Sequence, residues 1–163
     1  MPFVVPFDDS DLAKAALSRA VEFSRILEEP IVVVSIIPER DVRYAKAHGW
    51  LADDEAFDYE RIINYLQQSA INMAPNAEFR HSRVDRYASP GVIAGRIRQL
   101  ARELDASMVF IGSENAGRIV SAVSSVGNQV AADQSYDVVI IRANKPSTIP
   151  VLNTDSHQND TVT

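Results

Sequence analysis

The chain has 163 residues, no cysteine and a formal net charge of −6 at pH 7. This length fits one domain, and the lack of cysteine excludes disulfide bonds and thiolate metal sites. A pI of about 5.0 argues against a general nucleic-acid binder, which would carry a basic face. The first residues lack the basic region and apolar length of a signal peptide, and no window of about 18 residues is apolar throughout. We therefore expect a cytoplasmic protein without a membrane or nucleic-acid partner.

Apolar runs and helical patterns alternate along the first half of the chain. Residues 31–37 are nearly all β-branched and show no alternation, which is typical of a parallel strand covered on both faces. Residues 79–84 alternate apolar with polar side chains, as an edge strand does. The pattern predicts, in chain order, a strand at 3–7, a helix at 11–29, a strand at 31–37, a polar connection at 38–53, a helix at 54–73 and a strand at 79–84.

The second half of the chain continues this alternation. Ser89-Pro90 is typical of the first turn of a helix. The pattern predicts a helix from there to 104, a strand at 108–111 that ends at Gly112, a short helix at 125–133 and a last strand at 138–141. We therefore predict a single α/β domain at 1–143, an open and mainly parallel five-stranded sheet with helices on both faces. The polar segment 144–163 lacks aromatic residues and is predicted to be a disordered tail.

Ligands of open parallel sheets bind beyond the carboxyl ends of the strands, where the strand order reverses. Three segments of this chain follow predicted strands in this way: Asp8-Asp9-Ser10, Ile36-Ile37-Pro38 and Gly112-Ser113. Asp8 has two readings, as a ligand-binding carboxylate or as a helix N-cap. Ser10 is better explained as an N-cap.

Four segments in this order also carry a family resemblance: V-P-F-D-D-S at 5–10, the strand at 31–37, the segment 105–113 that ends in Gly-Ser, and the segment 135–142. Together they make residues 3–142 similar to the universal stress protein family, which opens with V-P-x-D-x-S. The family's second strand usually ends in His-Val, where this chain has Ser35-Ile36. The resemblance implies the sheet order 3-2-1-4-5 and a stress or regulatory protein that binds ATP or AMP.

The nucleotide-binding branch of the family carries G-x-x-G-x9-G-[S/T] after its fourth strand, and this chain departs from that pattern. The segment 112–134 reads GSENAGRIVSAVSSVGNQVAADQ. One alignment places Gly117 and Gly127 on the motif. The preferred alignment places Ser124-Ser125-Val126 on the family's G-S-V and keeps the distance to the last strand. Glycines in such loops let backbone N–H groups approach phosphates, so the loss of the glycine at Ser124 predicts weak binding.

The resemblance implies that Asp8 and Ile36 face adenine and ribose, and that the loop faces the phosphates. Ser125 has two equal readings, as a cap of the following helix or as a phosphate ligand. Arg118 is the only cation of the loop and is better explained as a solvated side chain. The candidate nucleotide-binding residues are Pro6, Phe7, Asp8, Ile36, Ile111, Gly112, Ser113, Gly117, Ser124, Ser125 and Val126.

The sequence contains no constellation that points to catalysis or to a metal site. His48, His81 and His157 have no metal-ligand spacing and are interpreted as ordinary surface histidines. Neither a G-x-S-x-G elbow nor a phosphate-binding Walker loop is present. We therefore expect no enzymatic activity and no metal.

Two functional hypotheses follow. The first is a cytoplasmic stress or regulatory protein that binds ATP or AMP weakly, and the alternative is a dimeric interaction module of the same fold that binds no nucleotide. The four apolar residues Val138-Val139-Ile140-Ile141 form an edge strand in the family's strand order. Since a bare apolar edge promotes association, we expect a homodimer joined through this strand.

Overall fold

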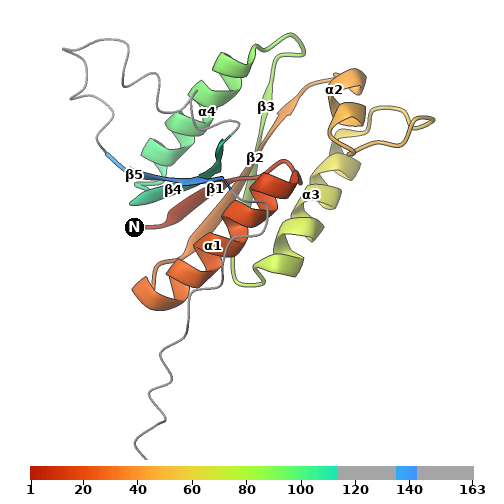
Figure 1. Ribbon diagram of the computed structural model, residues 1–163. Coiled ribbons are helices and arrows are strands. Elements are labelled where there is room, and N and C mark those ends of the chain that lie inside the picture. The colour runs from red at the N-terminus through yellow and green to blue at the C-terminus, as the bar shows by residue number, and fades with distance from the viewer. Residues whose placement is uncertain (114–134, 143–163) are drawn as a thin grey trace, which may run out of the picture.

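The computed structural model describes residues 1–113 and 135–142, and Figure 1 shows their arrangement. The predicted short helix at 125–133 and the predicted tail at 144–163 lie outside these residues. The elements, in chain order, are β1 (Phe3–Pro6), α1 (Asp11–Leu27), β2 (Ile31–Pro38), α2 (Val42–Ala47), α3 (Tyr59–Met73), β3 (Glu78–Val84), α4 (Pro90–Glu103), β4 (Met108–Gly112) and β5 (Asp137–Ile141).

The five strands form one parallel sheet in the order β3-β2-β1-β4-β5. This confirms the predicted α/β class and strand order. β2 is buried at all eight of its positions, as its unbroken apolar run predicts. Strands are added on one side of β1 first and on the other side later, so the order reverses between β1 and β4. A crevice at the carboxyl ends of these strands is the expected place for a ligand.

Side chains alternate between the two faces of the central strands, so the core has two halves. Val5 and Val33 belong to the half that packs against α1 and α3. Val4 and Val32 belong to the half that packs against α4. Figure 1 accordingly shows α1 and α3 on one side of the sheet and α4 on the other. Both faces of the central strands are thereby removed from water.

The predicted polar connection at 38–53 contains the helix α2, and here the prediction is wrong. The Asp41 side chain caps this helix by accepting a hydrogen bond from the backbone N–H of Tyr44 at 2.9 Å. α2 has six residues and buries only Ala45. So short a helix with one small buried residue carries no apolar stripe that a periodicity search can find.

The following helix, α3, begins at Tyr59 rather than at the predicted residue 54. The Asp58 side chain accepts a hydrogen bond from the backbone N–H of Arg61 at 3.2 Å and defines the start. The acidic residues at 53–55 had favoured an earlier start, because acids are common in a first turn. The cap geometry of Asp58 decides the boundary.

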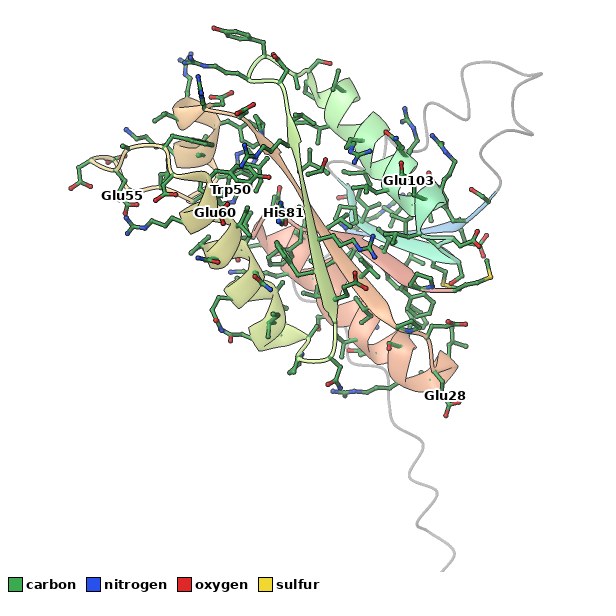
Figure 2. All side chains as sticks on the ribbon, turned by 180° about the vertical axis from the view of Figure 1, so that it is seen from behind. Glu28, Trp50, Glu55, Glu60, His81 and Glu103 are labelled. Atoms are coloured by element: carbon green, nitrogen blue, oxygen red, sulfur yellow. The ribbon has the colours of Figure 1, made fainter. Side chains whose placement is uncertain are left out.

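β3 is an edge strand, as its alternating pattern predicts. In Figure 2 it runs in front of the sheet between α3, which carries Glu60, and α4, which carries Glu103. The Arg83 guanidinium lies 3.8 Å from the centroid of the Tyr59 ring and covers part of this edge. Within residues 1–113 and 135–142, no helix has the length and apolar character to cross a membrane.

Candidate functional site

A cavity of about 250 Å³ lies at the carboxyl ends of β1, β2 and β4, where the strand order reverses. It is bounded by α4 on one side and by residues of α2 and its C-cap on the other. Six predicted site residues line it, namely Pro6, Phe7, Asp8, Ile36, Ile111 and Gly112. The topology therefore brings together residues that are more than 100 positions apart in the sequence.

Of the remaining predicted site residues, the structure describes Ser113 alone. Ser113 follows β4 directly and is exposed, outside the cavity wall. Gly117, Ser124, Ser125 and Val126 lie outside the described residues. The described part of the site is thus the part that the resemblance assigns to the base and the ribose.

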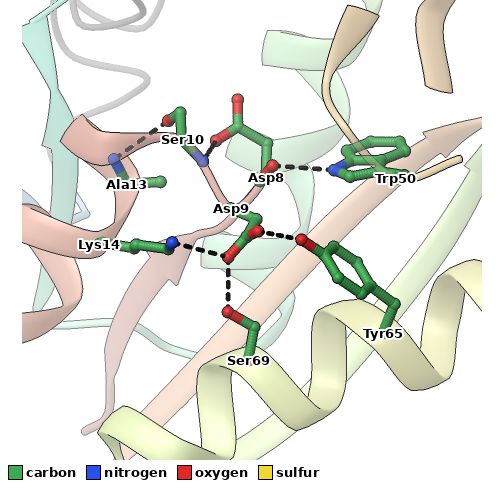
Figure 3. Close-up of polar contacts among 8 residues, drawn as sticks. All are labelled: Asp8, Asp9, Ser10, Ala13, Lys14, Trp50, Tyr65 and Ser69. Carbon is green, nitrogen blue, oxygen red and sulfur yellow. Dashed lines mark hydrogen bonds and ion pairs between the residues drawn. The ribbon is translucent and has the colours of Figure 1, made fainter. Parts of the chain in front are cut away.

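One oxygen of the Asp8 carboxylate accepts a hydrogen bond from the protein backbone, and the other faces His48. Its Oδ1 accepts a hydrogen bond from the backbone N–H of Ser10 at 3.0 Å, and its backbone oxygen accepts one from Trp50 Nε1 at 2.9 Å (Figure 3). Its Oδ2 lies 4.0 Å from His48 Nε2. Asp8 is therefore not the helix cap, and Oδ2 remains able to accept a hydrogen bond from a ligand.

Ser10 is the N-cap of α1, as predicted. Its side chain accepts a hydrogen bond from the backbone N–H of Ala13 at 3.2 Å. This contact fixes the start of α1 and, through the Ser10 N–H, the orientation of the Asp8 carboxylate. Ser10 also lines the cavity.

Asp9 turns away from the cavity and braces the turn between β1 and α1 against α3. Its carboxylate accepts hydrogen bonds from Tyr65 and Ser69 and pairs with Lys14 Nζ at 3.5 Å (Figure 3). The bond from Tyr65 to Asp9 is the main cause that raises the pKa of Tyr65 above its ordinary value. The two adjacent aspartates therefore have separate roles, one toward the cavity and one toward the scaffold.

Ser35 holds the end of β1 in place from the neighbouring strand. It is buried, and its hydroxyl donates a hydrogen bond to the backbone oxygen of Phe7 at 2.6 Å. The Phe7 N–H donates in turn to the backbone oxygen of Val34 at 2.8 Å. With both backbone groups of Phe7 occupied, the position from which Asp8 leaves the strand is fixed.

Gly112 is required at the end of β4 for reasons of space. A Cβ atom built on it would lie 2.8 Å from Leu12 Cβ, closer than two non-bonded carbon atoms approach in proteins. Gly112 is not among the described residues with a left-handed φ. The absence of a side chain, rather than an unusual φ, lets β4 pack against the first turn of α1.

The cavity is lined by both polar and apolar residues, and Asp8 lies near the polar groups of Ser10 and His48. The walls come from β2, β4 and α4 and include Val34, Ile36, Ile93, Ile97 and Ile111. Among the described residues that line it, Asp8 is the only carboxylate and neither lysine nor arginine is present. In residues 1–113 and 135–142, no group of three or more His, Asp or Glu side chains is placed to hold a metal ion. Apolar side chains beside a carboxylate acceptor suit a planar ligand that carries donor groups.

The family model described as the Universal stress protein family matches residues 1–142. The chain belongs to the universal stress protein family. No curated protein matches it. The match covers both the described cavity residues and the segment 114–134 that lies outside the described structure.

Solved universal stress proteins share the fold of this family member at low sequence identity. One, solved in complex with cAMP, is 23% identical with a TM-score of 0.51, covering 87% of this chain and 97% of its own. One from Archaeoglobus fulgidus, solved in complex with dAMP, is 23% identical with a TM-score of 0.53, covering 87% and 98%. UspA of Lactobacillus plantarum is 17% identical with a TM-score of 0.53, covering 87% and 97%.

In this universal stress protein, α2 and its C-cap add two cavity residues that the sequence analysis missed. They are Tyr44 and His48, whose rings stack with centroids 3.9 Å apart. The interpretation of His48 as an ordinary surface histidine is thus incomplete, because 28% of its side chain is exposed and it lines the cavity. Tyr44 and His48 are four residues apart in the connection after a predicted strand. This spacing could have indicated that both lie on one helix face near the ends of the strands.

Proposed function

We propose that this universal stress protein binds an adenine nucleotide, AMP or ATP, in the cavity at the ends of β1, β2 and β4. The observation that carries the proposal is Oδ2 of Asp8, which lines the cavity beside apolar side chains and, unlike Oδ1, is not occupied by the Ser10 N–H. A carboxylate oxygen in this position accepts a hydrogen bond from the amino group of adenine, while Ile36 and the α4 side chains contact the ring. The role is that of a stress or regulatory protein that binds without turnover.

Two relatives support the choice of adenine. Two solved universal stress proteins are in complex with cAMP and with dAMP, and both of these molecules contain adenine. The described cavity of this chain offers no cationic side chain for the phosphates. Since phosphate binding then depends on the loop after Ser113, which departs from the family's glycine pattern, we expect weak binding, micromolar or poorer.

Isothermal titration calorimetry with AMP and ATP tests the proposal. The Asp8→Asn variant replaces the carboxylate by an amide of the same size, and we expect it to weaken AMP binding about tenfold, the loss of one charge-assisted hydrogen bond. Asp11→Asn is the matched control, because it removes a carboxylate from the exposed first turn of α1 outside the cavity. Absence of binding at millimolar AMP and ATP, or equal affinities of the two variants, would reject the proposal.

A second candidate function is a dimeric interaction module that binds no nucleotide. The observation that favours it is the exposed apolar edge of the sheet at β5, where Ile140 is 40% exposed. We propose that two copies pair along this strand. Dimerisation is compatible with nucleotide binding, so only failed titrations together with a measured dimer would favour this function over the first.

A further inference from the structure

Three contacts orient the His48 ring and leave Nε2 facing Asp8. Its ring stacks on Tyr44 with an interplanar angle of 22°. Its Nδ1 lies 2.8 Å from the backbone oxygen of Tyr44. The indole of Trp50, anchored on the backbone oxygen of Asp8, lies 5.1 Å from it between ring centroids. Nε2 is left facing Oδ2 of Asp8 at 4.0 Å.

These contacts determine which nitrogen of the neutral ring carries the proton. A backbone carbonyl oxygen can only accept a hydrogen bond, so Nδ1 must donate to Tyr44. Nε2 of a neutral imidazole that is protonated at Nδ1 is an acceptor. The cavity therefore presents two acceptors side by side, Asp8 Oδ2 and His48 Nε2, with no hydrogen between them.

We propose that His48 is a second base-reading residue of this site, which selects an amino-bearing purine over an oxo-purine together with Asp8. The proposal rests on the proposed nucleotide function. An amino group has two hydrogens, and one nitrogen can reach both acceptors, because their separation of 4.0 Å is well below twice a usual N–H···O distance of about 2.9 Å. An oxo group at the same position turns a third acceptor toward them and leaves both unpaired, which is how sites built on hydrogen bonds reject analogues.

The experiment measures binding of adenosine and inosine to the full chain at pH 8.0 by ligand-observed NMR. Nucleosides are used because they carry the base without the phosphates, so that the readout concerns base recognition alone. We expect the wild-type protein to prefer adenosine about tenfold. His48→Phe keeps a ring on Tyr44 but has no acceptor, and should reduce the preference about three- to tenfold.

His48→Gln separates the acceptor role from a structural one. Its amide oxygen restores an acceptor, so we expect the preference for adenosine to return. Nitrogen chemical shifts of His48 in the wild-type protein provide a measurement that needs no variant, and should place the ring proton on Nδ1. Unchanged selectivity in His48→Phe, or a ring proton on Nε2, would overturn the proposal while nucleotide binding stands. Failure of wild-type protein to bind either nucleoside or AMP would overturn both.

Discussion

Asp8 and Asp9 are neighbours with the same side chain, but their surroundings give them different roles. Asp8 lines the cavity, and Asp9 supports the turn between β1 and α1. Asp9 has a left-handed backbone with φ of 65°, which aspartate tolerates better than most residues. Its bonds to Tyr65 and Ser69 of α3 and its ion pair with Lys14 hold the turn in that conformation. The position of the Asp8 carboxylate in the cavity therefore depends on contacts made outside it.

The first prediction concerns Tyr65, whose hydroxyl donates to Asp9 at 2.6 Å. That bond, then burial and the Asp9 charge raise the pKa of Tyr65 above its ordinary value of 10.0. Because folding favours the protonated phenol, the stabilisation is complete below pH 10 and is lost as the pH rises through the folded-state pKa. We expect Tyr65→Phe to lower the free energy of unfolding at pH 7 by about 0.5–1.5 kcal/mol and to lose less stability at alkaline pH.

Urea unfolding between pH 7 and pH 11 measures both effects. Tyr87→Phe is the control, because its ring is 85% exposed. A Tyr65→Phe protein whose alkaline loss of stability equals that of the wild type would show that the bond to Asp9 does not couple to folding.

At the scale of elements, the two helices after β2 depend on their caps to different degrees. α2 has six residues and buries only Ala45, whereas α3 has fifteen residues and buries four side chains in the core. An isolated short helix is marginal in water, so α2 persists through its cap and its aromatic contacts with Trp50. Because α2 and its C-cap carry Tyr44 and His48, loss of this helix should affect the cavity more than the fold.

Asp41→Ala and Asp58→Ala test this difference as a matched pair, since each removes one N-cap. A lost cap costs about 1 kcal/mol. We expect Asp58→Ala to lower the melting temperature without changing AMP affinity. Asp41→Ala should weaken AMP binding with a smaller change in melting temperature, because α2 opens locally. Calorimetry measures the AMP affinity, and thermal unfolding measures the melting temperature. If the loss of affinity relative to the drop in melting temperature were the same in both variants, α2 would have no local role.

At the scale of the whole molecule, the two edges of the sheet differ in character. β3 is exposed at four of its seven positions and carries charged side chains such as Arg80, which pairs with Glu78. β5 carries Val138 and Val139 half-buried and Ile140 exposed. Charged edges resist strand pairing and apolar edges promote it. Among the described strands, the charged edge at β3 and the apolar edge at β5 agree with the proposed pairing of two copies along β5.

Ile140→Lys should convert a dimer paired through β5 into a monomer. The side chain is already 40% exposed, so a lysine can reach water in the monomer without disturbing the core, but it would oppose its own copy across a two-fold axis. Light scattering after size-exclusion chromatography measures the mass. Val92→Lys, at a 52% exposed position on α4, should leave the mass unchanged. A monomeric wild-type protein at tens of micromolar would rule out this interface.

The main features of the fold could be predicted from local patterns. The apolar run of β2 indicated a central parallel strand, and Ser10 indicated the start of α1, because both signals lie within a few residues of one another in the chain. The resemblance then supplied the strand order and the place of Asp8. Short-range propensity was insufficient for α2, whose existence depends on a cap and on packing rather than on a stripe.

The composition and the order of the chain were enough to predict an α/β domain with a candidate ligand site at the carboxyl ends of its strands, because burial of β-branched runs and capping of helices are local in the sequence. Only the tertiary structure decided the chemistry at that edge. Asp8 and His48 are 40 positions apart, and Trp50 reaches the Asp8 backbone across a comparable separation. Whether such residues meet depends on the path of the segment after β2 and on the tautomer that the Tyr44 carbonyl selects, and no periodicity in the sequence encodes either.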